Sequence, residues 1–224
     1  MIKNIVNLGD AAIYCDFGHD VNKEINSKVI KYFRALKQKN LKGITNLSPS
    51  YNKLIITFDL NETCFDNLKQ EIIDLNINMK VENQSQKINI PICCDDEFSL
   101  DIERIEKKFG KSKSEIINLF LNKNYFCYMT GFVAGMPFLG DIDNKIQLNR
   151  LKTPRVKVPK GSIGLTEQFC NIYTYESPGG WNIIGNTPLE IFKKKNEEKP
   201  ALINPGDIVK FKQITKDEYD KIKR

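Results

Sequence analysis

Apolar positions in the first third of the chain follow a strand-like pattern in two regions and a helix-like pattern in two others. Residues 6–17 and 44–59 are rich in β-forming side chains, and turn residues divide the second region into two strands. Between them, apolar side chains recur every three to four residues as far as residue 38, which is the period of an amphipathic helix. A shorter segment of the same kind carries Phe65, Leu68, Ile72 and Leu75. The resulting order, β-α-β-β-α-β, predicts a small ferredoxin-like α+β domain.

A polar stretch at residues 81–89 has no core pattern, and we expect the boundary between two domains within it. The first domain would cover residues 1–82 and the second residues 83–224. The second domain is predicted to begin with a strand at residues 90–94, followed by a pair of helices. A chain of this length can bury a substantial core.

The two helices at the start of the second domain have well-marked ends. Ser99 is a candidate N-cap for the first helix, and Gly110 would end it. The apolar side of that helix would consist of Leu100, Ile102, Ile105 and Phe109. Ser112 and Glu115 have the spacing of a capping box, in which the two side chains satisfy free backbone amides at the start of the second helix.

Beyond the helix pair, short β-rich runs alternate with turn residues. Seven of the nine prolines and nine of the 13 glycines fall in residues 126–224. This density of turns, without a long helical period, indicates a closed or partly closed β-barrel.

Composition and charge exclude several classes of protein. An apolar fraction of 41% in 224 residues is typical of a globular chain, and no apolar run approaches the roughly 20 residues that span a bilayer. The net charge of +6 comes largely from scattered lysines, which argues against a nucleic-acid surface. The first residues lack the regions of a signal peptide, so we expect a cytoplasmic protein. The six cysteines contain no C-x-x-C pair, and we expect free, mostly buried thiols and no metal site.

Arg155 and Lys157 are the first candidates for binding a ligand. They lie two residues apart in a predicted strand, and side chains with this spacing share a face. Two cations on one face could hold a carboxylate or a phosphate, and an arginine binds such groups through two parallel hydrogen bonds. A solvated outer face of the barrel would explain the same pattern.

The segment SPGGW, at residues 177–181, contains the only tryptophan of the chain. Two consecutive glycines reverse a strand readily, and they also let backbone amides approach a ligand closely. The segment is therefore either a tight turn that carries a core aromatic or a rigid loop shaped around a ligand. The glycine-rich segment at residues 130–140 leaves a similar choice, because a sharply bent strand needs glycines as well.

Several common catalytic motifs are missing from the sequence. It has no G-x-x-x-x-G-K-[ST] phosphate loop, no G-x-S-x-G turn and no H-E-x-x-H pair. His19, the single histidine, is expected to be a surface or packing residue. Asp141 and Asp143 could act as bases or bind a metal, although exposed acids are common in loops. The sequence therefore names no general base.

Five segments together resemble one known family in their order and spacing. They are PSYNKLIITFD (49–59), GFVAGMPFLG (131–140), TPRVKVPKGSIG (153–164), SPGGWNIIGNTP (177–188) and NPGDIVKF (204–211). This family is the B subunit of 5-oxoprolinase, also called KipI or allophanate hydrolase subunit 1, and it is similar to half of the carboxyltransferase domain of urea carboxylases. The resemblance covers nearly the whole chain.

The resemblance implies a cyclophilin-like β-barrel after the ferredoxin-like α+β domain. It also implies an ATP-dependent enzyme made of several chains. In this family the B subunit works with a homologous C subunit, together with an A subunit, to open 5-oxo-L-proline to L-glutamate at the expense of ATP. A lactam is a stable amide, so ATP would activate its carbonyl oxygen by phosphorylation before water attacks. Because this chain has no phosphate loop, we expect ATP to be shared with the partner subunits.

The resemblance also gives roles to the candidate residues. The implied substrate-binding residues are Arg155, Lys157, Ser177, Pro178, Gly179, Gly180 and Trp181. The two cations would hold an anionic substrate or a phosphorylated intermediate. The two glycines would bring backbone amides close to it, and the tryptophan would form a wall.

The chain departs from the family pattern in four places, which include Phe120 at a family histidine and Asn149 at a family proline. Ala134 and Met136 replace the first proline and the second aromatic of G-F-x-P-G-F-P-[FY]-L-G, and Phe169 and Asn171 replace the glutamine and glycine of Q-T-G-I-Y-P. Such changes suit the alternative function as well. In that alternative, the chain is a regulatory protein of the KipI type that binds and inhibits a histidine kinase without catalysis.

Overall fold

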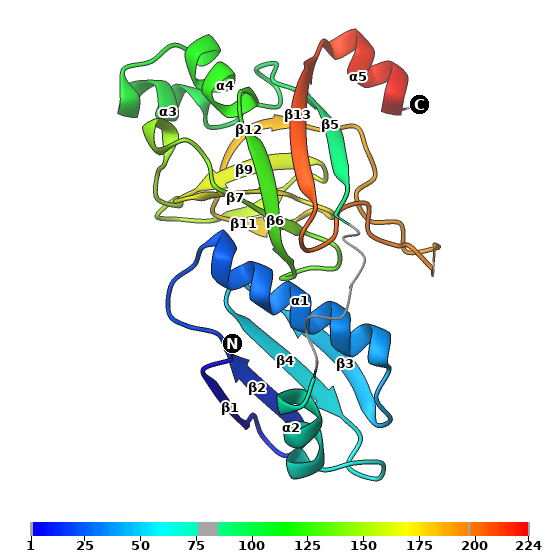
Figure 1. Ribbon diagram of the computed structural model, residues 1–224. Coiled ribbons are helices and arrows are strands. Elements are labelled where there is room, and N and C mark those ends of the chain that lie inside the picture. Colours follow the sequence, from blue (N-terminus) through cyan, green and yellow to red (C-terminus); the bar gives the residue numbers. More distant parts are fainter. Residues whose placement is uncertain (1, 76–84, 197, 224) are drawn as a thin grey trace. The chain divides into compact units, whose positions relative to one another are not determined.

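The computed structural model describes residues 2–75, 85–196 and 198–223 and divides the chain into two compact units, Met1–Gln84 and Ser85–Arg224 (Figure 1). The boundary expected between residues 82 and 83 lies outside the described residues. None of the helices in the described part is long and apolar enough to cross a membrane.

The first unit is a four-stranded antiparallel sheet with two helices. Its elements are β1 (Asn4–Asn7), β2 (Ala12–Asp16), α1 (Lys23–Lys39), β3 (Ile44–Pro49), β4 (Lys53–Phe58) and α2 (Phe65–Ile73). The strands lie in the order β1-β2-β4-β3. Helix α1 packs on β3 and β4 and helix α2 packs on β2, so that both helices share one core with the sheet. The ferredoxin-like α+β domain predicted from the sequence is confirmed.

One strand of this sheet comes from an unexpected part of the chain. The pattern predicted the last strand after α2, within residues that the structure does not describe. In the described part of the chain, the strand beside β2 is instead β1, which forms a hairpin with β2 across a turn at Gly9. Residues 6–17 therefore belong to two strands, because the left-handed backbone of Gly9 (φ +64°) reverses the chain between them.

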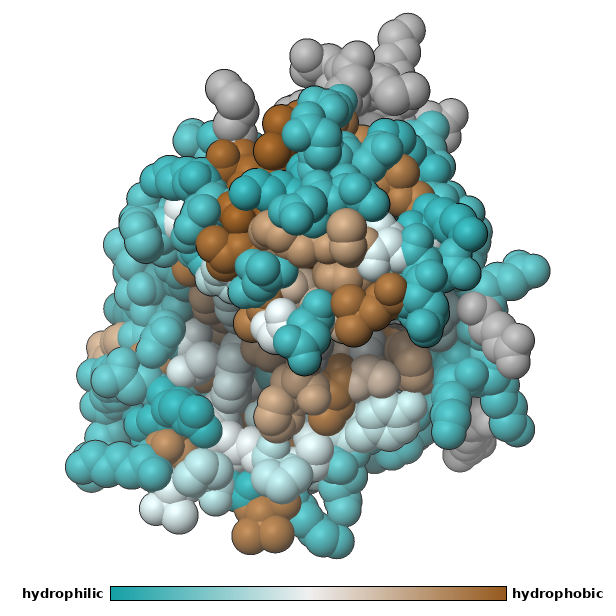
Figure 2. All heavy atoms as spheres, turned by 90° about the horizontal axis from the view of Figure 1, so that it is seen from below, coloured by the Kyte–Doolittle hydropathy of each residue, from teal (hydrophilic) through white to brown (hydrophobic). Residues whose placement is uncertain are grey.

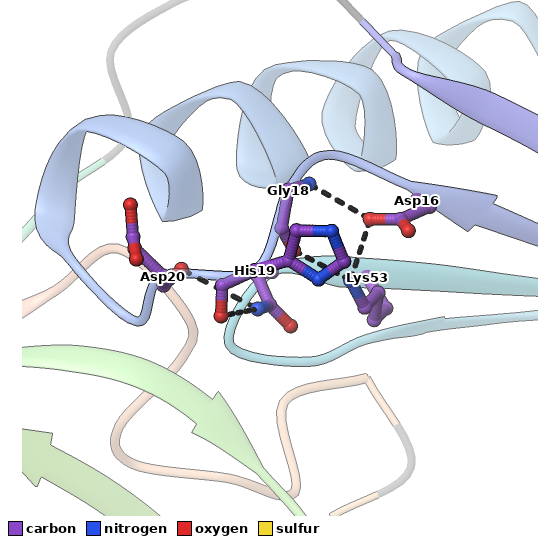
Figure 3. Close-up of polar contacts among 6 residues, drawn as sticks. Asp16, Gly18, His19, Asp20 and Lys53 are labelled. Atoms are coloured by element: carbon purple, nitrogen blue, oxygen red, sulfur yellow. Dashed lines mark hydrogen bonds and ion pairs between the residues drawn. The ribbon is translucent and has the colours of Figure 1, made fainter.

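An ion pair stabilises the end of β2. The Asp16 carboxylate accepts hydrogen bonds from Lys53 Nζ at 2.5 Å and from the Gly18 amide at 2.7 Å (Figure 3). Lys53 Nζ also donates to the Gly18 carbonyl oxygen at 2.6 Å. The lysine hydrogen bond, assisted by the amide, lowers the pKa of Asp16 below its ordinary value of 3.8. Beside this pair, His19 is exposed, and its carbonyl oxygen accepts from the Asn52 amide.

The surface of the first unit is not uniformly hydrophilic. The face seen from below shows apolar side chains among the hydrophilic ones (Figure 2). The exposed large apolar side chains in the described part of this unit are Val6, Leu8, Leu60 and Ile73. Exposure of single apolar residues is ordinary on protein surfaces and indicates no function by itself.

The second unit is a closed β-barrel with helices. Its elements are β5 (Lys87–Cys93), α3 (Ile102–Phe109), α4 (Lys113–Leu121), β6 (Asn124–Thr130), β7 (Pro137–Gly140), η1 (Asn144–Ile146), β8 (Arg155–Val158), β9 (Ser162–Thr166), β10 (Phe169–Ile172), β11 (Ser177–Gly179), β12 (Asn182–Asn186), β13 (Ile208–Ile214) and α5 (Lys216–Lys223). The barrel closes in the order β10-β7-β6-β13-β5-β12-β9. This confirms the predicted barrel, and β8 and β11 pair separately from it.

Helices α3 and α4 close one end of the barrel (Figure 1). The Phe120 ring of α4 packs against the rings of Tyr125 and Phe211, with centroid distances of 5.0 and 4.8 Å. The Tyr125 hydroxyl donates to the Phe120 carbonyl oxygen at 2.6 Å, which satisfies a buried polar group inside this apolar core.

The predicted helix ends are mostly confirmed. Gly110 ends α3 in the left-handed conformation, and Ser112 and Glu115 form the capping box of α4. The N-cap predicted at Ser99 is wrong, since α3 begins after Asp101. The Ser99 hydroxyl instead donates to the carbonyl oxygens of Cys94 and Ile184, and Leu100 is exposed rather than buried.

The six thiols give a test of the core. All are free, and only Cys64 is exposed. Burial raises the pKa of Cys15 and Cys94 to about 12 and raises those of the other three buried thiols as well. We expect an aromatic disulfide reagent at pH 8 to modify about one thiol per native chain and all of them in denaturant, because the thiolate is the reactive form. Cys64→Ser should abolish modification of the native chain. Rapid modification of a second thiol in the native chain would contradict the burial of the other five.

The Asp16 ion pair gives a second test. Because its pKa is lowered, its contribution to the free energy of unfolding is full above pH 3.8 and is lost as pH falls through the lowered value. Asp16→Asn should reduce that free energy by about 1 kcal/mol or less near neutral pH, since the pair is partly solvated. The difference from the native chain should shrink below pH 3.8 in urea titrations, and the exposed Asp20→Asn is the matched control. A difference that persists unchanged at low pH would contradict the assignment.

Candidate functional site

The cationic segment and the glycine-rich turn pair with each other. Strands β8 and β11 form a two-stranded antiparallel ribbon, in which Ser177 lies opposite Val158 and Gly179 lies opposite Arg155. The structure therefore brings together the two segments that the sequence singled out. We call this two-stranded sheet the β8–β11 ribbon.

A bulge separates the two candidate cations. Three steps along β8 oppose two steps along β11, which interrupts the alternation of side chains. Val156 and Lys157 are consequently both exposed. Lys157 pairs with the exposed Glu176 at 3.2 Å, whereas Arg155 pairs with a buried carboxylate. The shared face of Arg155 and Lys157 was predicted from regular strand alternation, and the bulge interrupts that alternation.

Arg155 ties the ribbon to the barrel through Asp101. Arg155 Nη2 donates to Asp101 Oδ1 at 2.7 Å, and the other carboxylate oxygen accepts from the backbone amide of Ile183 in β12 at 2.7 Å. Asp101 is only 5% exposed, so both of its oxygens are satisfied away from water. Arg155 Nη1 is buried and has no hydrogen-bond partner in the described part of the chain.

The ribbon covers part of the outer wall of the barrel. In β10, Cys170 and Ile172 point into the barrel core, and strand alternation places Asn171 on the outer face. Outside the barrel, a second apolar cluster consists of Met136, Val158, Tyr173 and Ile183. Because Val158 belongs to the ribbon and Ile183 to the barrel, this cluster is the packing between them.

Asn171 lies in the middle of this outer face. Its neighbours across the sheet are Phe138 in β7 and Gly164 in β9. Its Nδ2 donates to Met136 Sδ at 3.5 Å, and its Oδ1 is buried without a partner in the described residues.

Trp181 follows the ribbon and packs against both neighbours of Asn171. Its ring meets the Phe138 ring edge to face, with centroids 5.6 Å apart. A Cβ added at Gly164 would lie 2.8 Å from Trp181 Cβ and 2.8 Å from Asn171 Oδ1, so this position tolerates no side chain. Trp181 is half-buried and lies against the outer face of the barrel.

The two glycines of the turn also allow close approaches. A Cβ at Gly179 would lie 2.1 Å from the Tyr173 hydroxyl oxygen, and one at Gly180 would lie 3.1 Å from the Arg150 guanidinium. The Gly180 carbonyl oxygen accepts from the Leu151 amide at 2.6 Å. The glycines therefore bring a tyrosine hydroxyl and an arginine against the backbone of the turn.

The remaining members of the turn lie at its start. Pro178 is exposed, whereas the Ser177 hydroxyl oxygen is buried without a partner in the described residues.

Tyr173 connects the groups of the outer face. Burial raises its pKa, while hydrogen bonds from the Asn171 side chain and the Trp181 amide act in the opposite direction. The charges of Arg150 and Arg155 also act to lower it. The positive charges of Arg150 and Arg155 thus stabilise negative charge near Tyr173. Lys157 does not contribute to this effect.

The two loop acids have structural roles. Asp141 accepts a hydrogen bond from the Tyr128 hydroxyl at 3.0 Å. Asp143 accepts from the Lys145 amide at the start of η1 and pairs with Lys123 at 3.8 Å. Across the described ranges, no cluster of histidine, cysteine and acidic side chains could hold a metal ion.

Sequence reasoning missed three residues of this region. Asp101 was not singled out as a site residue, because nothing local indicates that it contacts the ribbon. Arg150 lies in the same cationic segment as Arg155 and Lys157, and no contact with the turn was predicted for it. Asn171 and Tyr173 were visible as polar positions in and just after a β-rich run, but their burial beneath the ribbon depends on the pairing of distant segments.

Comparisons with known proteins agree with this architecture. A family model described as the carboxyltransferase domain, subdomain C and D, matches residues 3–203. The chain is 31% identical to the B subunit of 5-oxoprolinase from Bacillus subtilis (strain 168) over 227 residues, which cover 96% of this chain and 94% of the relative. It is also 31% identical to the B subunit of 5-oxoprolinase from Haemophilus influenzae (strain ATCC 51907 / DSM 11121 / KW20 / Rd), covering 93% of this chain and 96% of the relative.

A crystal structure extends the comparison to three dimensions. The protein TTHA0988 superposes with a TM-score of 0.83 at 26% sequence identity, and the match covers 92% of this chain. The chain spans only 40% of the length of TTHA0988.

The Asp101 contact gives a prediction for stability. Asp101→Asn should lower the free energy of unfolding of the second unit by about 2 kcal/mol, because it leaves the Arg155 guanidinium without its buried counter-charge. Urea unfolding can be followed by the fluorescence of Trp181, the only tryptophan. Glu176→Gln, which removes an exposed ion pair, should cost less than about 0.5 kcal/mol. Equal costs for the two variants would contradict the tie between ribbon and barrel.

Proposed function

Because the chain belongs to the family of carboxyltransferase-domain subdomains C and D, in which its relatives include 5-oxoprolinase B subunits, we propose that it is the B subunit of an ATP-dependent 5-oxoprolinase. The reaction opens the lactam of 5-oxo-L-proline to L-glutamate. Water adds to the carbonyl carbon, the ring C–N bond breaks, and the nitrogen takes up a proton to become the amino group. Cleavage of ATP to ADP and phosphate drives this step, because the lactam is a stable amide.

The observation that carries this proposal is the match along nearly the full length of two relatives of that name. A relative that shared only one of the two units would support the fold but not a common role. The outer face of the barrel adds a physical reason, since it combines cationic, hydrogen-bonding and aromatic groups suited to a small anionic lactam.

Each part of the proposed site has a distinct task. The guanidinium groups of Arg150 and Arg155 supply positive charge for the substrate carboxylate or a phosphorylated intermediate. Arg155 keeps one buried donor, Nη1, that no group in the described part of the chain uses. Gly179 and Gly180 let the backbone of the turn lie close to the ligand, and Trp181 forms its wall. Ser177 and Pro178 set the start of the turn.

Lys157 would act at a distance from the bound ligand. It is exposed and pairs with an exposed glutamate, so its charge is screened by solvent. Lys157 would attract an anion toward the site rather than hold it there.

Partner chains complete the proposed enzyme. The sequence has no phosphate loop, and we assign ATP to a site that this chain shares with the homologous C subunit and the A subunit. The general base would come from a partner, since the loop acids Asp141 and Asp143 are used structurally.

Reconstitution tests the proposal. The purified chain alone should show no 5-oxoproline-dependent release of phosphate from ATP, and addition of its cognate A and C subunits should restore it. Arg155→Gln in the assembled complex should raise KM for 5-oxo-L-proline by at least about tenfold, because a charged hydrogen bond to an anion contributes about 1.5–3 kcal/mol. Glu103→Gln, an exposed acid on α3, is the matched control with unchanged kinetics.

A folded complex of all three subunits without any 5-oxoproline-dependent ATP cleavage would contradict the proposal. If such an inactive chain instead bound a histidine kinase and lowered its autophosphorylation, the regulatory function of the KipI type would replace it.

A further inference from the structure

In the described residues of the second unit, three buried polar atoms without hydrogen-bond partners lie in the ribbon and on the barrel wall beneath it. These atoms are Arg155 Nη1, Asn171 Oδ1 and Ser177 Oγ. Arg155 and Ser177 belong to the ribbon, and Asn171 lies on the barrel wall that the ribbon covers. Because burial of an unpaired polar atom costs about 1–3 kcal/mol, these atoms need an explanation. A ligand that pairs with these atoms would provide one.

Asn171 is the most enclosed of the three residues. It is 2% exposed, and Gly164 and Phe138 flank it on the neighbouring strands. The Cβ of Trp181 lies over Gly164, and its ring reaches Phe138 on the opposite side. Trp181 therefore spans β10 and covers the carboxamide of Asn171.

We propose that Asn171, which stands where the family pattern has glycine, adds a contact to the lactam group of the substrate beneath Trp181, an inference that rests on the proposed 5-oxoprolinase function. A carboxamide carries an acceptor and a donor side by side. A small lactam ring presents the complementary pair, because its N–H and C=O are held cis to each other. Asn171 Oδ1 accepts from the lactam N–H, and Asn171 Nδ2 donates to the lactam carbonyl oxygen.

Binding of a lactam to Asn171 would break no strong hydrogen bond of its Oδ1. Oδ1 has no partner to give up in the described residues. The side chain donates to the Tyr173 hydroxyl, and Nδ2 also faces the thioether of Met136, which is a weak acceptor that a carbonyl oxygen can replace. Exchange of the thioether for a carbonyl oxygen would strengthen the hydrogen bond. The charges of Arg150 and Arg155 act on the adjacent Tyr173, so the carboxylate of the same ligand would face them.

This pairing predicts which ring compounds the site accepts. L-Proline has the ring and the carboxylate but no lactam carbonyl, and its ring nitrogen is charged. It would leave Nδ2 without an acceptor and would place a cation near two arginines. A site built around hydrogen bonds rejects a ligand that cannot make them far more strongly than an apolar site does. 2-Pyrrolidone keeps the lactam without the carboxylate and should bind, but more weakly than 5-oxo-L-proline.

Trp181 reports on this binding without any catalysis. Since it covers Asn171, a ligand that reaches the carboxamide must displace or stack on the indole. Trp181 is the only tryptophan of the chain, so its emission isolates this position. Titration of the purified full-length chain with 5-oxo-L-proline and 2-pyrrolidone should change its fluorescence saturably, whereas L-proline should not.

Substitution of Asn171 separates recognition from packing. Asn171→Leu keeps a similar shape but removes both hydrogen-bonding atoms, and it should raise Kd for 5-oxo-L-proline at least about tenfold. Because removal of an unpaired buried acceptor offsets the loss of the hydrogen bond to Tyr173, its melting temperature should stay close to that of the native chain. Asn186→Leu is the matched control: this buried amide donates to the Lys160 carbonyl oxygen at 3.0 Å and accepts from the Tyr219 hydroxyl at 2.9 Å. That variant should lose stability and keep its affinity.

Two results would overturn the inference. One is the absence of a saturable fluorescence change with either lactam. The other is an unchanged Kd in Asn171→Leu, with a fall in melting temperature as large as in the control. Failure of the proposed function looks different. In that case lactams bind and Asn171→Leu weakens them, yet the complex of all three subunits cleaves no ATP in response to 5-oxo-L-proline.

Discussion

The buried Asp101 carboxylate links the ribbon of the proposed site to the barrel. One of its oxygens holds the Arg155 guanidinium, and the other accepts the backbone amide of Ile183. The ribbon has only two strands, which are rarely stable alone in water, so it depends on such contacts with the barrel. With Arg155 held in place, Gly179 stays opposite it, and the turn that follows sets the position of Trp181. This charged contact, together with the apolar packing between ribbon and barrel, therefore positions Trp181 over the outer face.

The barrel provides the apolar core, and the ribbon shields the polar side chains on the outer face of the barrel. The inner face of β10 fills the apolar core with Cys170 and Ile172, and this core closes without any polar side chain from the site. The outer face carries Asn171 and Tyr173, whose polar atoms the ribbon shields from water. The ribbon thus excludes water from polar groups that lie outside the apolar core of the barrel, which lowers the local dielectric constant. Charges and hydrogen bonds are stronger there than on an open surface, which favours recognition of a small polar ligand.

Local signals in the sequence predicted what is local in the structure. The helical period as far as residue 38 and the Ser112–Glu115 capping box need only neighbouring residues, and both are found. The barrel followed from the density of turns. The role of Ser99 was wrong because its hydroxyl bonds a carbonyl of β12, a partner distant in the sequence. The bulge at Lys157 and the Asp101 contact depend on the pairing of separate segments, which one sequence pattern does not encode.

We propose that the substrate binds on the outer face of the barrel, between Asn171 and Trp181. The most direct measurement is a crystal structure of the complex of all three subunits, soaked with 5-oxo-L-proline. We expect density for the ring under the Trp181 indole, with the lactam against Asn171 and the carboxylate toward Arg150 and Arg155. A ring bound elsewhere in the complex, with Trp181 still packed over an unaltered Asn171, would contradict it.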